Sequence, residues 1–143
     1  MNPLQAALAG ITHDNPRHRD LAVEYLADLL GRAVLNEADA ETAVSRLVAL
    51  LTTETDPSVQ EAALNAISEA FGPYCFSLQL FEPLRALLGA MPPTLLDYAL
   101  MILACTHDPD ARPTIETFLD HPNAAVRASA AEALTELPGR TIP

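Results

Sequence analysis

Carboxylate and imidazole groups are the side chains of this chain that are best suited to chemistry. Both groups occur close together in two segments, 12–18 and 106–110, and each segment contains the tripeptide Thr-His-Asp. A structural zinc site needs Cys and His at set spacings, and a helical site places two His at i and i+4. Neither segment has such a spacing. We therefore expect no metal and no cofactor, and we interpret both tripeptides as loop and helix-cap sequences in which Asp accepts backbone N–H bonds.

Nucleophilic catalysis has little support in the sequence. Cys75 and Cys105 have no His near them along the chain, and the 5 glycines are scattered rather than gathered in a phosphate-binding loop. A Gly-x-Ser-x-Gly elbow, which would expose a nucleophilic serine, is absent from the sequence. Acidic residues are abundant, but abundance on exposed faces is a weak sign of tuned pKa values. The sequence predicts a protein that is not an enzyme, with two free thiols in a reducing compartment.

Composition indicates a single all-α domain with a strongly acidic charge. Half of the 143 residues are apolar and Trp is absent; the apolar residues are mostly Ala and Leu, two of the strongest helix formers. The formal net charge is -11, from 19 acidic residues and 8 basic residues that are all Arg. Such a charge disfavours binding to the phosphate backbone of nucleic acids and favours a basic partner.

Source and location are expected to be bacterial and cytoplasmic. Abundant Ala, Arg and Pro without Lys is typical of a GC-rich coding bias, which suggests a bacterial source. The first twenty residues lack the basic start and apolar run of a signal peptide. The longest apolar stretch, 95–105, contains Asp97 and is too short to span a bilayer, so we expect no membrane association.

A pattern of apolar residues at intervals of about four positions recurs along the chain. Residues with this spacing share one face of a helix. The copies are Val126, Ala130 and Leu134; Val59, Ala63 and Ile67; Leu95, Ala99 and Leu103; and, more weakly, His18, Ala22 and Leu26. We call the first residue of each copy its anchor. Each anchor follows a proline, at Pro16, Pro57, Pro93 or Pro122, and proline suits the first turn of a helix. Asn15 and Asp56 are expected to cap two of these helices, and Asp120 is expected to cap the last.

Four further segments with helical periodicity alternate with these copies. They are 3–11, 39–51, 77–89 and 110–120. Pro83 either begins the helix in 77–89 or kinks it. The sequence therefore predicts eight helices in about four antiparallel pairs, forming one domain over 1–137 with a tail over 138–143.

Two of the copies resemble the second helix of a HEAT repeat. "TDPSVQEAALNAISEAF" (55–71) and "DHPNAAVRASAAEALTEL" (120–137) place Asp and Pro before the helix, then Val-Gln or Val-Arg, then alanines and an Ile or Leu. The third copy departs from this pattern with "LLDYAL", and the first has His18-Arg19. The resemblance implies an all-α HEAT-like solenoid, an α-α superhelix in which the second helix of each pair lines a concave binding surface.

An acidic ladder is expected on the faces of these helices that point away from the core. Positions +2, +6 and +10 from each anchor are mostly acidic and never basic, and the HEAT resemblance would place them on the concave side. The candidate partner-binding residues are Asp20, Glu24, Asp28, Glu61, Glu69, Asp97, Arg127 and Glu132. Tyr25, Tyr74 and Tyr98 are candidate aromatic contact residues at the edges of the binding surface. Core positions are the alternative for Tyr25 and Tyr98. The alternative interpretation of the ladder is an ordinary solvated surface.

The leading functional hypothesis is a non-catalytic protein–protein interaction module that binds a basic partner on this acidic face. A narrower form is an immunity-type inhibitor of a bacterial toxin domain. A second class is enzymatic: a protein similar to the phycobilin lyases and their chaperone-like relatives, which carry HEAT-like repeats and handle a tetrapyrrole. HEAT-like DNA glycosylases need a cationic groove, which the net charge opposes. A self-associating scaffold is a further alternative, because Leu96, Met101 and Cys105 make the outer face of the third copy more apolar. We expect the chain to be a monomer or a weak homodimer.

Overall fold

The computed structural model describes residues 2–138, so the tail expected over 138–143 lies outside the described residues except for Pro138. The chain divides into two compact units, one ending at Phe76 and the other beginning at Ser77. We call them the N-terminal and C-terminal units and describe each by itself. The single domain expected over 1–137 stays a prediction.

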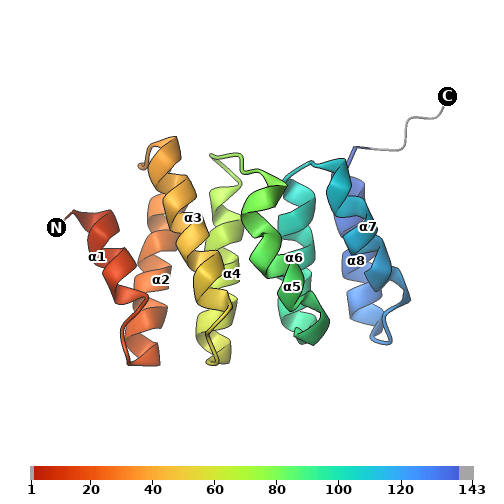
Figure 1. The fold of residues 1–143 in the computed structure, drawn as a ribbon, viewed down its shortest axis with the longest axis horizontal. Coiled ribbons are helices and arrows are strands. Elements are labelled where there is room, and N and C mark those ends of the chain that lie inside the picture. The colour runs from red at the N-terminus through yellow and green to blue at the C-terminus, as the bar shows by residue number, and fades with distance from the viewer. Residues whose placement is uncertain (1, 139–143) are drawn as a thin grey trace. The chain divides into compact units, whose positions relative to one another are not determined.

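The N-terminal unit consists of two helix pairs. Its helices are α1 (Pro3–Gly10), α2 (Pro16–Gly31), α3 (Glu37–Leu51) and α4 (Pro57–Ala70). Helix α1 packs against α2, α3 packs against α4, and the most extensive packing in the unit joins α2 to α4 (Figure 1). The second helices of the two pairs therefore lie side by side.

The C-terminal unit repeats this arrangement with shorter first helices. Its α-helices are α5 (Glu82–Leu87), α6 (Pro93–Cys105), α7 (Arg112–Glu116) and α8 (Ala124–Glu136). Turns of 3-10 helix flank α5 at Leu78–Phe81 and Leu88–Ala90, and flank α7 at Pro109–Ala111 and Thr117–Asp120. The main packing in this unit is between α6 and α8.

Proline explains why the segments 77–89 and 110–120 are broken into short pieces. Pro83 and Pro113 both lie in the first turn of their helices. Proline has no N–H to donate and its ring clashes with the carbonyl four residues earlier, so it is tolerated only near a helix start. Pro83 and Pro113 are accordingly the second residues of α5 and α7. Of the two alternatives for Pro83, the structure therefore selects the helix start.

The predicted helix starts are confirmed in three of the four copies. Pro16, Pro57 and Pro93 are the first residues of α2, α4 and α6. Asn15 accepts a bond of 2.8 Å from the N–H of Arg17, and Asp56 accepts one of 2.9 Å from the N–H of Ser58. These caps satisfy helix N–H groups that have no partner within the helix.

In the fourth copy the helix begins at Ala124, two residues after Pro122, so this proline lies before the helix and not in its first turn. Its cap is Asn123, which accepts from the N–H of Ala125 at 2.8 Å and of Val126 at 3.3 Å. Asp120 ends the preceding 3-10 turn, so its predicted capping role is wrong. The reason is local: Asn123 stands directly before the first helical residue, where a short side chain reaches the free N–H groups.

The predicted core faces are largely confirmed, with three corrections. The three apolar residues of the second copy and the three of the third copy are buried. Leu134 is only half-buried, and Ala133 is buried beside it. His18 is exposed, and its ring stacks on that of His13 with centroids 4.3 Å apart, so it is not a core anchor. Leu96, expected on an outer face, is 1% exposed and belongs to the core.

Candidate functional site

The residue after the anchor ties three of the repeated helices to the loop before them. Arg19 donates to the carbonyl of His13 at 2.9 Å, Gln60 to that of Glu54 at 2.8 Å, and Arg127 to that of His121 at 2.7 Å. In each case the acceptor lies six residues earlier in the chain. Loop carbonyls that the helix cannot reach are satisfied in this way. The long polar side chain at this position therefore has a structural role, and the equivalent Leu96 is instead buried.

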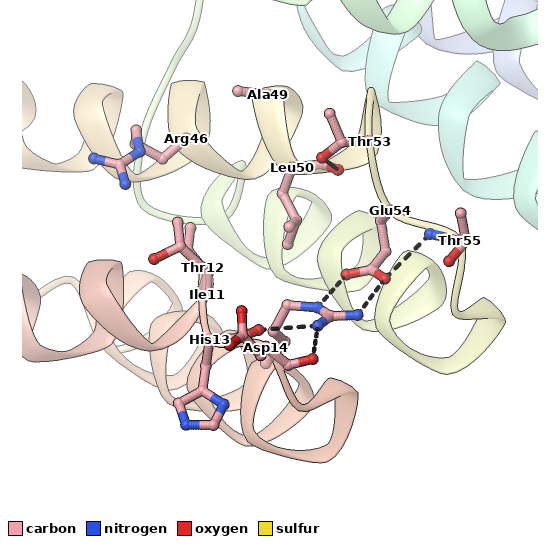
Figure 2. A pocket seen from close by; sticks show the side chains of 11 residues that line it. Ile11, Thr12, His13, Asp14, Arg46, Ala49, Leu50, Thr53, Glu54 and Thr55 are labelled. Carbon is pink, nitrogen blue, oxygen red and sulfur yellow. Dashed lines mark hydrogen bonds and ion pairs between the residues drawn. The ribbon is translucent and has the colours of Figure 1, made fainter.

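Arg19 also forms a two-bonded ion pair with Glu54, 35 residues away in the sequence. Its Nε and Nη2 atoms donate to the two carboxylate oxygens at 2.7 Å and 2.9 Å (Figure 2). Glu54 additionally accepts from the backbone N–H groups of Thr55 and Asp56, both at 3.1 Å. The pair therefore joins the first turn of α2 to the loop between α3 and α4. Through its bonds to the carbonyls of His13 and Asp14, Arg19 also connects the loop between α1 and α2 to this pair.

The environment of this pair favours the charged forms of both groups. The hydrogen bond from Arg19, helped by the two backbone N–H groups, holds the pKa of Glu54 below its usual value against the opposing effect of burial. The same hydrogen bond raises the pKa of Arg19. Both shifts follow from direct hydrogen bonding to the ionised form, and neither produces a group that exchanges protons near neutral pH.

A hollow of about 490 Å³ lies beside this ion pair. It is lined by Ile11, Thr12, His13, Asp14, Arg19, Arg46, Ala49, Leu50, Thr53, Glu54 and Thr55. The hydroxyls of Thr12 and Thr53 donate to carbonyls of their own helices, at 2.9 Å and 3.3 Å. Figure 2 shows Arg46 and Glu54 apart from one another. The polar bonds within this hollow tie the ends of helices to the loops that line it.

Five of the predicted acidic residues come together on the N-terminal unit. Asp20, Glu24 and Asp28 lie on α2, Glu61 and Glu69 lie on α4, and these two helices pack side by side. We call these five residues the α2–α4 acidic face. Glu24, Asp28, Glu61 and Glu69 are exposed, and Asp20 is half-buried.

Some polar contacts already engage this face. Asp20 accepts from the hydroxyl of Ser58 at 3.2 Å, which links α2 to α4. Asp28 pairs with Arg32 at 2.9 Å, one turn along α2. A shallow hollow of about 330 Å³ lies next to this pair and is lined by Ala27, Asp28, Gly31, Arg32, Asn65 and Glu69.

The remaining predicted residues lie on the C-terminal unit. Asp97 on α6 accepts from the hydroxyl of Ser129 on α8 at 2.7 Å, which repeats the Asp–Ser link of the other unit. Glu132 is exposed on α8. Arg127, although exposed, donates to the carbonyls of His121 and Pro122. A single ladder that runs through both units stays a prediction.

The tyrosines differ in their surroundings. Tyr25 is 44% exposed on α2, although a core position was one of the two alternatives for it. Tyr74 donates its hydroxyl to the carbonyl of Leu35 at 2.6 Å and accepts from the N–H of Leu35 at 3.1 Å, so it fixes the loop before α3. Tyr98 is half-buried on α6.

The cysteines and histidines of the described part of the chain differ in exposure and in their contacts. Cys75 and Cys105 are free thiols, and burial, assisted by Glu136, raises the pKa of Cys105 and disfavours its thiolate. Within residues 2–138, no three His, Cys, Asp or Glu side chains are grouped so as to hold a metal ion. Asp108 caps a 3-10 turn as predicted for the second Thr-His-Asp, whereas in the first Asn15 and not Asp14 is the cap. Among the described helices none has the length and apolar character needed to cross a membrane.

Comparison with known proteins agrees with the helix-pair architecture. The family model of HEAT repeats matches residues 81–141. The match covers less than half of the chain. The crystal structure of an engineered protein aligns with 95% of this chain, with a TM-score of 0.68 and 20% sequence identity, and this chain spans 62% of its length. Among curated proteins, none matches the sequence. The predicted all-α HEAT-like solenoid class is thereby confirmed.

Proposed function

We propose that this HEAT-repeat protein is a non-catalytic interaction module that binds a basic surface of a partner protein through the α2–α4 acidic face. HEAT repeats are typical of protein-interaction scaffolds, which supports the general class. The observation that carries the proposal is the packing of α2 beside α4, with Asp28 of α2 and Glu69 of α4 lining the same shallow hollow. Aligned charges of one sign steer an oppositely charged partner and select against others.

The arrangement on α2 has an energetic consequence that supports this proposal. Asp20, Glu24 and Asp28 follow one another at intervals of four residues, and each such like-charge pair destabilises a helix by about 0.2–0.5 kcal/mol. Arg32 offsets part of this repulsion at the end of the row. Cationic side chains of a partner would relieve the rest.

Affinity retention on the immobilised protein, with two variants that lose the same number of charges, tests the proposal. One variant replaces Glu24, Glu61 and Glu69 by Gln, and the control replaces Glu37, Glu41 and Glu82 by Gln, so both lose three charges. Immobilised wild type should retain basic proteins from a bacterial lysate, and rising salt should elute them. The first variant should retain at least about tenfold less of the same proteins than the control. Equal retention by the two variants, or retention that does not change with salt, would refute the role of this face.

The immunity-type inhibitor is the form of this proposal in which the partner is a basic toxin domain. The sign of the charge favours it, and its specific test is whether a co-expressed toxin domain encoded beside this gene copurifies with the chain and is neutralised by it.

Tetrapyrrole binding is supported less well. The hollow of Figure 2 has no Phe, Tyr or Trp in its lining, whereas a flat conjugated ligand is best held by aromatic side chains. Mixing the protein with a bilin should leave the absorbance spectrum of the bilin unchanged. A shifted spectrum would revive this alternative.

A further inference from the structure

Two large apolar side chains are exposed next to each other on α2. Leu21 is 56% exposed and Tyr25 is 44% exposed, and they stand one helical turn apart. His18 is exposed one turn before them. Because residues three and four apart share a helix face, the three form a continuous strip, which we call the open face of α2. It contains none of the five carboxylates of the α2–α4 acidic face, although Glu24 and Asp28 border it.

In the other copies the positions of His18 and Tyr25 are buried, and the position of Leu21 is half-buried. When the copies are aligned on their anchors, Tyr25 corresponds to Ala66 on α4, Ile102 on α6 and Ala133 on α8. These three residues are at most 1% exposed, so the position is a core position of the repeat. In the N-terminal unit α4 is packed against both α2 and α3, whereas α2 has its principal contacts with α1 and α4 (Figure 1). The open face of α2 is therefore a repeat-stacking surface without a covering helix within residues 2–76.

The last helix has the complementary feature. Ala128, Ala131 and Thr135 are exposed on α8, and we call them the open face of α8. The equivalents of Ala131 and Thr135 on α6 are Leu100 and Ala104, which are fully buried in the helix that packs against α8. This face is thus also a repeat-stacking position, and its side chains are small.

We propose that the open face of α2 of one molecule stacks on the open face of α8 of a second copy of this chain, head to tail. Large side chains interdigitate best with small ones, and here Leu and Tyr on one face meet Ala and Thr on the other. The contact would continue the stacking of second helices that α2 and α4 form within the N-terminal unit.

The charge of the chain gives this contact a distinctive salt dependence. Each copy carries a formal net charge of -11, so two copies repel one another. Salt shortens the screening length from about 10 Å at 0.1 M to about 3 Å at 1 M and so removes much of this repulsion. Self-association should therefore strengthen with salt, whereas binding of a basic partner to the α2–α4 acidic face should weaken. The two proposals can accordingly fail independently.

Sedimentation equilibrium of the full chain tests the stacking contact. Between about 10 μM and about 1 mM, the range of weak association, the average mass should rise steadily, and more so in about 1 M than in about 0.1 M salt. A head-to-tail pair leaves one α2 face and one α8 face uncovered, so further copies should add and the mass should pass beyond that of a dimer. A chain that stays monomeric throughout this range in high salt would overturn the proposal.

Two variants with matched controls assign the faces. Leu21→Glu and Ala131→Arg should each lower the association constant at least about tenfold. The controls make the same changes at exposed positions elsewhere, as Val34→Glu and Ala86→Arg, and should leave association unchanged. Loss of association in the controls to the same extent would overturn the assignment. If circular dichroism shows that Leu21→Glu is unfolded, Tyr25→Gln takes its place.

Mixing the two variants distinguishes head-to-tail stacking from a symmetric contact. The Leu21→Glu molecule keeps its α8 face and the Ala131→Arg molecule keeps its α2 face, so the mixture should form a 1:1 pair that grows no further. If Ala131→Arg alone associates as strongly as wild type, two α2 faces contact each other and the proposed occupant is wrong.

Discussion

Replacement of Glu54 by Ala should destabilise the N-terminal unit more than any other single change to an ion pair that the structure describes. The Glu54 side chain is 2% exposed and accepts two bonds from Arg19 and two from backbone N–H groups. Its removal leaves those donors without their partner and leaves the Arg19 charge, which is 17% exposed, without its counter-ion. Breaking a buried ion pair costs about 3–5 kcal/mol.

The lower end of that range applies here. Arg19 keeps its bonds to the carbonyls of His13 and Asp14, and its remaining exposure gives water access to the guanidinium. We therefore expect Glu54→Ala to lower the free energy of unfolding by about 3 kcal/mol. Urea unfolding followed by circular dichroism measures this difference, provided that the dependence on urea concentration is the same for both proteins.

Glu82 provides the matched control. It pairs with Arg85 at 2.7 Å, but that carboxylate is 56% exposed, and exposed pairs contribute at most about 1 kcal/mol. Glu82→Ala should therefore have a small effect. The double variant lacking both Arg19 and Glu54 should lose less stability than the two single variants together, because the two side chains stabilise each other. If Glu54→Ala and Glu82→Ala are equally destabilising, the Arg19–Glu54 link does not hold the two loops together.

Three further predictions concern local features of the fold. Gly10→Ala should lower stability by about 1–3 kcal/mol in a thermal melt, because its new Cβ would lie 2.7 Å from the Cβ of Ala22, whereas Gly89→Ala has no atom within 4 Å and should be neutral or mildly stabilising. Asp56→Ala removes the cap of α4 and should lower the free energy of unfolding by about 1 kcal/mol in urea; no loss would argue against the cap. The pKa of Glu54 is lowered in the folded state, so the stability that its charge provides is complete above its unfolded pKa of about 4.3 and is lost as pH falls through the lower folded value. Urea melts from neutral to acid pH should show the advantage of wild type over Glu54→Gln shrinking below about pH 4, and a constant difference would contradict this.

Helices and their starts were predictable because their determinants lie within one turn of the chain. Asn15 and Asp56 reach N–H groups two residues ahead, and Pro16, Pro57 and Pro93 fix the backbone at the first helical position. The miss at Asp120 has the same physical cause, since the capping rule selects the residue directly before the helix, and that residue is Asn123.

The candidate site was predictable only in part. Helical periodicity correctly placed Glu24 and Glu61 on exposed faces. It could not identify the ion pair of Arg19 with Glu54, because these residues are 35 positions apart. They come into contact only when the loop between α3 and α4 lies against the first turn of α2. A partial signal was present in the residue after the anchor, since Arg127 at the equivalent position bonds to its loop in the same way.

The sequence by itself determined the all-α class, the helix pairs and the acidic character of the chain, because propensity, periodicity and charge are local or additive properties. The tertiary structure decided which faces are covered. His18 is the anchor of the first copy and was expected in the core, whereas Leu96 follows the anchor of the third copy and was expected on the outer face. His18 is nevertheless exposed and Leu96 is buried. Tyr25 is exposed at a position where Ala66 is buried, for the same reason. Burial depends on whether another helix lies against a face, and that is a property of the packed chain and not of any single segment.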